Sequence, residues 1–296
     1  MASKKVLITG KNSKLGKAFE WYISGSDIAV DSISLRDGSW KEADWSGYDA
    51  ILHVAGITKT DTGTLSSEKE SEYFSVNSDL TREVAQKAKN DRVSQFIYLS
   101  TMMVYGNAAR IGSDRLITED TIPVPECAYG RSKLAGESIS ELGSDDYKVL
   151  IVREPVIYGE HFDGEVDALY RIAQRVGLFP NINSCKSFIY EGNLCELLRL
   201  AIINELSGII CPQNREMITT SQLYCRMRNS YGKKCHLIKG LKGLLSLLSH
   251  VSAKIDVLFQ SIRYSEELSC VDGIDYKIFS LEESLSRIDE YRKEHV

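Results

Sequence analysis

The first half of the chain alternates short apolar runs with stretches in which apolar residues recur at helical spacing. Runs that stop at glycine or at charged turn residues indicate buried strands, and the stretches between them indicate helices. Strands are predicted at residues 6–8, 28–35, 50–56, 95–100 and 148–152, and helices at 15–23 and 70–90. Because strands and helices alternate, the pattern predicts an α/β fold with a doubly wound parallel sheet.

The pattern changes after about Gly159, where helical spacing prevails and strand signals become fewer. Ser280 and Glu283 have the spacing of a capping box and predict the start of a last amphipathic helix. Other helices of this half are predicted at 166–176, 194–203, 221–231 and 241–255. We therefore expect a smaller, mostly helical region packed over the carboxyl ends of the strands.

The loop between the first strand and the first helix carries glycines at both ends, Gly10 and Gly16. Glycines at such a turn let a pyrophosphate approach the backbone closely and rest on the helix N-terminus. Ser13 occupies the central position where a third glycine is usual, and its hydroxyl is still able to cradle phosphate. Taken alone, the loop fits phosphate binding only modestly better than an ordinary strand-to-helix turn.

Tyr129 and Lys133 are spaced i, i+4 and therefore lie on one face of a predicted helix. An ammonium group there holds the phenol near ionisation, so that the tyrosine exchanges a proton near neutral pH. Thr101, after the strand at 95–100, is the candidate hydroxyl that shares this proton, whereas Ser100 is predicted to be a hydrogen-bonding residue at the strand end. His53 is predicted to be a satisfied core histidine or a histidine at the edge of the cofactor, rather than a catalytic residue. A phosphate loop followed by Tyr-x-x-x-Lys indicates a redox enzyme that moves hydride.

Composition and charge exclude some classes of protein. The net charge of −5 argues against a nucleic-acid-binding protein. Seven cysteines, an odd number with no C-x-x-C pair, fit reduced thiols in a cytoplasmic protein. No signal peptide precedes the first strand, and no apolar run is long enough to cross a bilayer. Residues 240–248 have amphipathic spacing, which favours core packing over contact with a membrane surface or a partner.

The motifs together resemble the extended short-chain dehydrogenase/reductases of the nucleotide-sugar epimerase/dehydratase group. The resemblance covers roughly residues 4–205, through Thr-Gly-x-x-Ser-x-x-Gly, His53–Gly56, Ser100–Gly106, Thr118–Thr121 and Tyr129–Lys133. It implies a Rossmann-type NAD(P)-binding domain at 1–160. A substrate-binding region follows at 161–296, with elements that return to the sheet. It also implies that Tyr129 exchanges the proton, that Lys133 holds the nicotinamide ribose, and that Thr101 is the family's Ser/Thr.

The resemblance implies NAD or NADP as the cofactor and no metal. The choice between the two depends on the end of the second strand, where an acid binds the NAD ribose and an arginine favours the 2′-phosphate of NADP. Arg36 and Asp37 stand side by side there. We favour NADP contact for Arg36, while Asp37 fits a solvated turn equally well. The expected cofactor-binding residues are Gly10, Lys11, Asn12, Ser13, Leu15, Gly16, Arg36, Ala55, Gly56, Tyr129, Lys133 and Pro155.

Departures from the family concern the substrate. Met102 and Met103 stand where family dehydratases carry Asp-Glu, which argues against a 4,6-dehydratase. The family's Arg-Pro-Pro strand end is Arg153-Glu154-Pro155 here. Lys186 would meet a diphosphate or be a solvated lysine, and His161 would line a sugar pocket or a plain loop. The expected substrate-binding residues are Thr101, Met102, His161, Phe162 and Lys186.

These features predict hydride transfer on a nucleotide-activated or lipid-diphosphate-linked sugar, with a 4-epimerase as the preferred activity. A 4-ketoreductase of a nucleotide sugar uses the same residues and fits Arg36 better. A non-catalytic NADP-binding regulator is the third possibility, and the intact set of Thr101, Tyr129 and Lys133 argues against it. The resemblance also implies a homodimer, formed through the helix at 70–90 and the helix that carries Tyr129.

Overall fold

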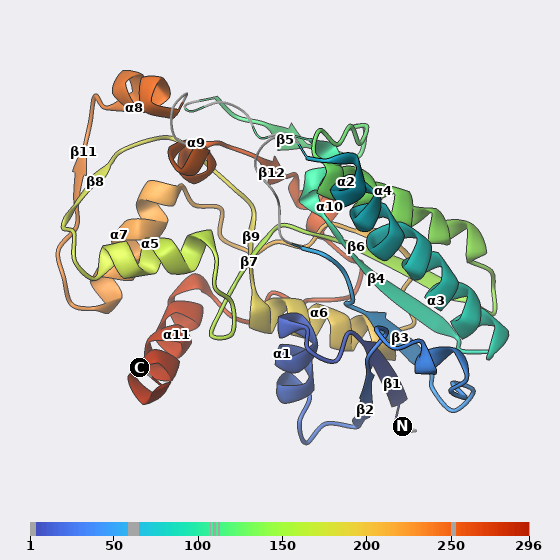
Figure 1. Cartoon of the computed structure of the whole chain (residues 1–296). Helices are drawn as coiled ribbons and strands as arrows, with labels where there is room; N and C mark the ends of the chain where they lie inside the picture. Colours follow the sequence, from blue (N-terminus) through green and yellow to red (C-terminus); the bar gives the residue numbers. More distant parts are fainter. Residues whose placement is uncertain are drawn as a thin grey trace.

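The computed structural model describes residues 4–58, 65–106, 108, 111, 113–249 and 253–295. Its centre is a six-stranded sheet in which all paired neighbours run parallel, in the order β10-β6-β4-β3-β1-β2 (Figure 1). The strands are β1 (Lys4–Thr9), β2 (Ile28–Ile33), β3 (Ala50–His53), β4 (Gln95–Thr101), β6 (Lys148–Glu154) and β10 (Gly208–Ile210). The predicted α/β fold with a doubly wound parallel sheet is confirmed.

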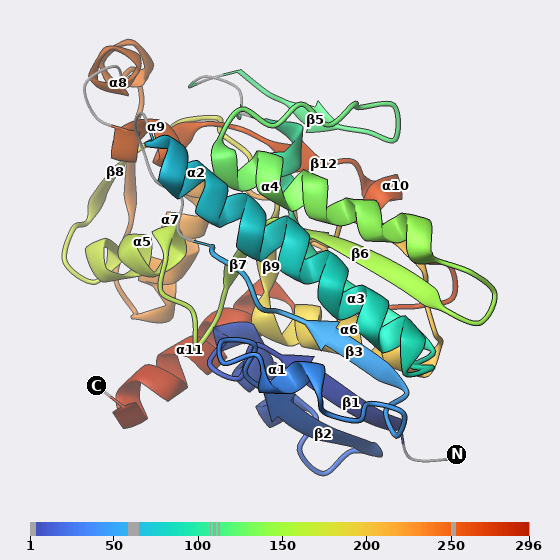
Figure 2. The same cartoon turned by 45° about the vertical axis from the view of Figure 1, so that its right-hand side comes forward.

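Helices cover both faces of this sheet (Figure 2). One face is covered by α1 (Lys14–Tyr22) and α6 (Glu191–Ile203), and the other by α2 (Ser67–Phe74), α3 (Leu80–Asn90) and α4 (Ala128–Gly136). Side chains of successive strand residues alternate between the two faces, so Ile8 packs with Phe19 of α1 whereas Ile51 packs with Val84 of α3. Burial on both faces explains why the strands read as apolar runs.

The predicted helix at 70–90 is interrupted. Residues Ser75–Asp79 form a π-helical turn (η2) between α2 and α3. The 3-10 turns are η1 (Ser39–Lys41), η3 (Met102–Tyr105) and η4 (Glu137–Leu142). Apolar spacing does not reveal a π-helical turn, because one inserted residue shifts the helical face without breaking the helix.

The C-terminal half contains α5 (Glu165–Ala173), α7 (Thr220–Ser230), α8 (Lys242–Ser249), α9 (Ala253–Phe259), α10 (Glu266–Ser269) and α11 (Leu281–His295). The capping box at Ser280 and Glu283 is confirmed, since each side chain bonds the other's backbone N–H group. The single helix predicted at 241–255 is wrong, because α8 ends at Ser249 and α9 begins at Ala253. Residues 250–252 lie outside the described residues.

Three pairs of short strands lie outside the main sheet and were not predicted. They are β7 (Val156–Tyr158) with β9 (Phe188–Tyr190), β8 (Leu178–Pro180) with β11 (His236–Ile238), and β5 (Leu116–Ile117) with β12 (Arg263–Tyr264). Strands of two or three residues are too short to carry a periodic pattern. Two elements beyond residue 160 complete the N-terminal architecture, because β10 pairs with β6 in the main sheet and α6 packs against that sheet. The boundary at 160 itself stays a prediction.

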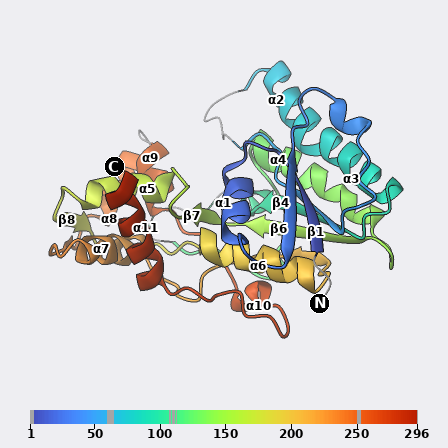
Figure 3. The same cartoon turned by 90° about the horizontal axis from the view of Figure 1, so that it is seen from below.

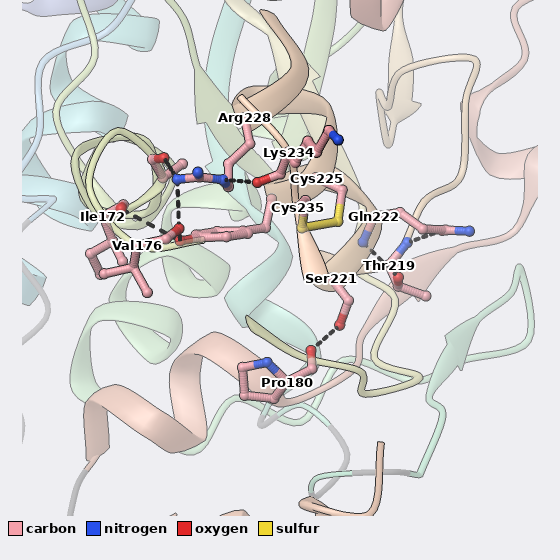
Figure 4. The surroundings of a disulfide bond; sticks show 12 residues. Ile172, Val176, Pro180, Thr219, Ser221, Gln222, Cys225, Arg228, Lys234 and Cys235 are labelled. Atoms are coloured by element: carbon pink, nitrogen blue, oxygen red, sulfur yellow. Dashed lines mark hydrogen bonds between the residues drawn. A yellow bond between two sulfur atoms is a disulfide. The ribbon is translucent and has the colours of Figure 1, made fainter. Parts of the chain in front are cut away.

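Two cysteines depart from the prediction of reduced thiols. Cys225 of α7 and Cys235, just before β11, form a disulfide across a Cα–Cα distance of 5.2 Å (Figure 4). A chain reversal between these elements brings the two residues within the range that a disulfide requires. Spacing alone did not indicate this turn. Cys127, Cys185, Cys195, Cys211 and Cys270 are free.

None of the helices that the structure describes is long and apolar enough to span a membrane.

Candidate functional site

The loop after β1 has the geometry of a phosphate cradle. Gly10 adopts φ +104°, and a Cβ at this position would lie 2.9 Å from the backbone nitrogen of Ala55. Ser13 is the N-cap of α1, and its hydroxyl accepts a hydrogen bond from the Gly16 N–H group at 3.3 Å. Lys11 and Asn12 are exposed on the outer side of the loop. A dinucleotide pyrophosphate therefore fits here, against bare backbone at a helix N-terminus.

The three predicted catalytic residues converge at the carboxyl end of β4. Thr101 is the last residue of β4, and its side chain is a hydrogen-bonding neighbour of the Tyr129 phenol, which comes from the first turn of α4. The Lys133 ammonium donates to the backbone carbonyl of Leu99 at 2.8 Å. Thr101 and Tyr129 are each 6% exposed and Lys133 is 4% exposed. The hydroxyl, phenol and ammonium groups thus share one largely water-free site.

Close packing of α4 explains this convergence. A Cβ on Gly130 would lie 2.6 Å from the carbonyl oxygen of Met103, and one on Gly136 would lie 2.3 Å from that of Asn77. The Cys127 side chain caps the helix by accepting from the Gly130 N–H group at 3.3 Å. Larger residues at the two glycines would push α4 outward, and Tyr129 would move away from β4.

Asn77, in the π-helical turn, is a site residue that the sequence analysis missed. Its carboxamide accepts from the Ile57 N–H group at 2.9 Å and donates to the Ile57 carbonyl at 3.1 Å and to the Ser132 hydroxyl at 3.0 Å. A Cβ on Gly56 would lie 3.0 Å from the Asn77 Oδ1 atom and 3.2 Å from the Lys133 Nζ atom. Asn77 therefore holds the predicted cofactor loop of Ala55 and Gly56 beside the lysine. A π-helical turn at a functional site is common, and only the structure reveals it.

Glu154 places a carboxyl group beside the predicted catalytic residues. It is the last residue of β6 and pairs in register with Thr101, so the two side chains leave the same face of the sheet. Burial raises the pKa of Glu154 to about 7, although Lys133 counteracts the shift. In the described part of the chain, this carboxyl group makes no hydrogen bond and no ion pair. The sequence analysis noted Glu154 as a departure from the family without assigning it to the site.

The electrostatics of Tyr129 and Lys133 follow from the same burial. Burial lowers the pKa of Lys133 to about 8, while Glu154 and Glu137 act in the opposite direction. Burial also raises the pKa of Tyr129 well above its ordinary value, Glu154 adds to the rise, and Thr101 opposes it. Tyr129 therefore keeps its proton at neutral pH when no further positive charge lies beside it.

A buried ion pair fixes the strand ends under the site. The Arg153 guanidinium donates to both carboxylate oxygens of Glu137, at 3.0 and 2.6 Å, and to the Tyr105 hydroxyl at 2.7 Å. Ser100 donates to the same carboxylate, which matches its predicted role at the strand end. Pro155 follows on β6 and is buried. The Glu137 carboxylate thus links the end of α4 to Ser100 of β4 and Arg153 of β6.

His53 is a core residue, as predicted. Its Nδ1 atom lies 2.7 Å from the Thr9 hydroxyl, and its Nε2 atom lies 3.1 Å from the Thr81 hydroxyl. Burial, with a smaller contribution from Lys133, lowers the pKa of His53 to about 3, so the ring is neutral.

The end of β2 lies against the phosphate loop. The Ile33 carbonyl accepts from the Gly10 and Lys11 N–H groups at 3.0 and 3.2 Å. The Asp37 carboxylate accepts from the N–H group and hydroxyl of Ser39, at 3.1 and 2.7 Å. Arg36 is exposed beside it. The Asp37 carboxylate therefore makes its hydrogen bonds within its own turn, as expected for a solvated loop.

The predicted substrate residues other than Thr101 have partners within the protein. Lys186 is 5% exposed, and its ammonium binds the Glu165 carboxylate at 3.0 Å and the Val257 carbonyl. The His161 Nδ1 atom lies 2.8 Å from the Glu191 carboxylate, at the start of α6. Phe162 packs against the apolar core under α6, and Met102 is buried at the start of η3. Lys186 is thus no solvated lysine, and contact of these residues with a substrate stays a prediction.

Comparisons with known proteins find relatives that are similar in sequence or in fold. A curated relative from Escherichia coli O157:H7, N-acetyl-alpha-D-glucosaminyl-diphospho-ditrans,octacis-undecaprenol 4-epimerase, is 24% identical over 211 residues, which are 68% of this chain and 60% of the relative. Alignments with the first curated relatives span 36%, 60% and 31% of their lengths, less than two thirds in each case.

Two solved structures share the fold at low sequence identity. UDP-N-acetylglucosamine 4-epimerase from Bacillus cereus has a TM-score of 0.77 at 18% identity, over 98% of this chain and 100% of that chain. dTDP-4-dehydrorhamnose reductase from Bacillus anthracis str. Ames, in complex with NADP, has a TM-score of 0.72 at 21% identity, over 97% and 99% of the two chains.

A family model decides the assignment, because it matches residues 8–205, which include the phosphate loop, Thr101, Tyr129 and Lys133. The chain belongs to the NAD dependent epimerase/dehydratase family.

Proposed function

We propose that the protein transfers hydride at the C4 carbinol of a diphosphate-linked sugar, as a 4-epimerase. The observation that carries the proposal is the convergence of Thr101, Tyr129 and Lys133 beside a phosphate cradle. Met102 and Met103 stand where family dehydratases carry an acid pair, and methionine exchanges no proton. What these residues support is reversible oxidation and reduction at one carbon.

The residues of the described site fit a nicotinamide dinucleotide, which when bound supplies the hydride acceptor and donor. The loop from Gly10 to Gly16 would hold its pyrophosphate, with Leu15 packed beneath. Lys133 would bind the ribose next to the nicotinamide, near Ala55 and Gly56. Pro155 would border the same face at the end of β6.

Proton transfer would be carried by Tyr129. Its phenol would accept the proton of the C4 hydroxyl group during oxidation and return a proton to the keto oxygen during reduction. The Thr101 hydroxyl would orient the substrate oxygen. The Lys133 ammonium would lower the pKa of the phenol, and any further positive charge beside Tyr129 would oppose the effect of burial.

The curated relative and one of the solved structures support this choice, since both are named as 4-epimerases of diphosphate-linked N-acetylglucosamine. We therefore expect the substrate to be a nucleotide-activated or lipid-diphosphate-linked sugar. The homodimer implied by the resemblance remains part of the proposal, and light scattering of the purified protein tests it.

A 4-ketoreductase that uses NADPH is the second candidate. The exposed Arg36 beside a turn-bound Asp37 favours a cofactor with a 2′-phosphate. A reductase releases its cofactor in every cycle, whereas an epimerase keeps it. Mass spectrometry of the cofactor released on denaturation separates the two: near-stoichiometric NAD supports the epimerase, and an empty site that binds added NADPH supports the reductase.

The catalytic test uses Tyr129→Phe with UDP-N-acetylglucosamine, its undecaprenyl-diphosphate analogue and the matching 4-keto sugars. We expect the variant to lose about 10²- to 10⁴-fold in kcat, because the general acid–base group is removed while cofactor binding persists. Tyr147→Phe is the matched control, since Tyr147 is buried and donates to the Ala85 carbonyl on the same domain. Unchanged turnover in Tyr129→Phe would contradict the mechanism, and cofactor binding without turnover on any of these sugars would favour a regulator.

A further inference from the structure

The charges of the chain are unevenly distributed. The whole chain has a net charge of −5, yet residues 217–255 contain no aspartate or glutamate. The basic residues of this segment are Arg226, Arg228, Lys233, Lys234, Lys239, Lys242 and Lys254. Arg226 pairs with Glu282 and Arg228 is buried, so the exposed positive charge comes from Lys233, Lys234, Lys239 and Lys242. Exposed positive charge concentrated in one segment of an acidic protein attracts an anionic partner.

The same segment exposes leucines on one face of α8. Leu244 is 55% exposed, Leu247 is 70% exposed and Leu248 is 37% exposed. Their spacing of three and four residues places them on one helical stripe. Leu245, between them, turns inward and packs against the apolar core of the C-terminal half. Lys242 begins the helix and Lys239 lies just before it, and both residues are exposed.

The structure anchors this helix on both sides. The Cys225–Cys235 disulfide ties α7 to the residues just before β11, within the basic segment (Figure 4). β11 in turn pairs with β8. After α8, the Val257 carbonyl of α9 accepts a hydrogen bond from Lys186. In Figures 1 and 3, α8 and α9 lie at the end of the molecule opposite the N-terminal strands. The leucine stripe is therefore presented at one end by a folded scaffold.

We propose that α8, with Leu244, Leu247 and Leu248 and the flanking Lys239 and Lys242, docks on an anionic lipid surface. An interfacial helix combines an apolar stripe with lysines that contact acidic headgroups, and both features occur here. A second copy of the chain fits less well, because two basic segments would repel each other. The docking requires none of the residues of the hydride site, so it goes beyond the proposed function.

Physical principles set the strength of this contact. An eight-residue helix that inserts three leucines binds reversibly, and each lysine near an anionic surface adds about fivefold in affinity. Salt screens the charge contribution, because the Debye length falls to about 3 Å at 1 M ionic strength. We therefore expect binding to anionic vesicles that high salt weakens.

Vesicle sedimentation with the full chain tests the proposal. Vesicles of phosphatidylcholine with about one third phosphatidylglycerol are compared with vesicles of phosphatidylcholine alone, at low and high salt. We expect the wild-type protein to sediment with the anionic vesicles alone, and Leu247→Ser and the double variant Lys239→Glu/Lys242→Glu to lose at least about tenfold in partitioning. Ile122→Ser is the matched control, because Ile122 is 76% exposed and lies outside the basic segment.

Several outcomes would overturn the proposal. These are equal sedimentation with both kinds of vesicle, no sedimentation of the wild-type protein, and retained sedimentation of the α8 variants. A wild-type dimer that Leu247→Ser converts to a monomer would instead identify a second copy as the occupant. Thermal unfolding and cofactor binding of each variant confirm that it is folded. Hydride transfer without vesicle binding would refute the docking alone, and vesicle binding without hydride transfer would refute the proposed function alone.

Discussion

The end of β4 and the segment around α8 differ in whether their charged and apolar side chains are buried or exposed. At β4, Lys133 and the pair of Arg153 and Glu137 are buried and directed at protein partners. At α8, lysines and leucines lie exposed, side by side. Burial makes a charge sensitive to every neighbour, whereas water screens an exposed charge. We therefore propose proton chemistry for the first region and contact with an external surface for the second.

The largest effect expected from this comparison is on stability. Glu137→Gln leaves the Arg153 guanidinium buried without its counter-ion, and we expect a loss of about 3–5 kcal/mol in the free energy of unfolding. The matched control is Glu70→Gln, which breaks the exposed Arg131–Glu70 pair of 2.6 Å and is expected to cost about 0–1 kcal/mol. Denaturant unfolding of both variants measures the difference. Equal losses in the free energy of unfolding would mean that the buried ion pair contributes no more than the exposed one.

A second effect concerns the pH dependence of stability. Burial, with Glu160 as a close neighbour, raises the pKa of Glu191 to about 9. A raised folded-state pKa stabilises the protein at low pH, and this contribution is lost as the pH rises from about 4.5 through 9. We expect Glu191→Gln to gain about 1–3 kcal/mol relative to the wild-type protein between pH 5 and pH 9, because its amide stays neutral.

Thermal or urea unfolding at several pH values measures this gain. Glu72→Gln, at an exposed position of α2, is the control and should follow the wild-type curve. A Glu191→Gln curve parallel to that of the wild-type protein would mean that Glu191 is ionised in the folded state at neutral pH.

A smaller effect is expected at Glu154. Its carboxylate raises the pKa of Tyr129, so Glu154→Gln should move the ascending limb of the pH–rate profile for sugar oxidation to lower pH, by up to about one unit. At a fixed pH on that limb, the change is about tenfold or less. Glu119→Gln, at an exposed position, is the control. An ascending limb that stays in place or moves to higher pH would show that Glu154 does not raise the pKa of Tyr129.

The smallest effect is expected at the exposed end of β2. Arg36→Ser should weaken NADPH binding by about tenfold or less and leave NADH binding unchanged, because an exposed charged hydrogen bond contributes about 1 kcal/mol. Asp37→Ala provides the opposite test. If Asp37→Ala weakens NADH binding and Arg36→Ser has no effect on NADPH binding, the site is built for NAD. Fluorescence titration of both cofactors measures the two outcomes.

The patterns that predicted the fold correctly all lie within short stretches of the sequence. Apolar runs such as 95–100 and the i, i+4 pair of Tyr129 and Lys133 depend only on neighbours in the sequence. Features that combine distant segments were missed. Asn77 bonds to Ile57 and Ser132, and Glu154 meets Thr101 only when β6 lies beside β4. The Cys225–Cys235 disulfide depends on a chain reversal that spacing did not indicate.

The sequence by itself determined the parallel α/β architecture and predicted the phosphate loop and the proton-exchanging residues, because periodicity and short motifs are local properties of the chain. The tertiary structure decided the state and surroundings of those residues. Packing buried Tyr129 and Lys133 and half-buried Glu154, and so shifted their pKa values. Packing also gave Lys186 a partner in Glu165 and left Leu247 exposed. Burial is a property of the whole fold, and burial sets the free energy of a charge or an apolar side chain.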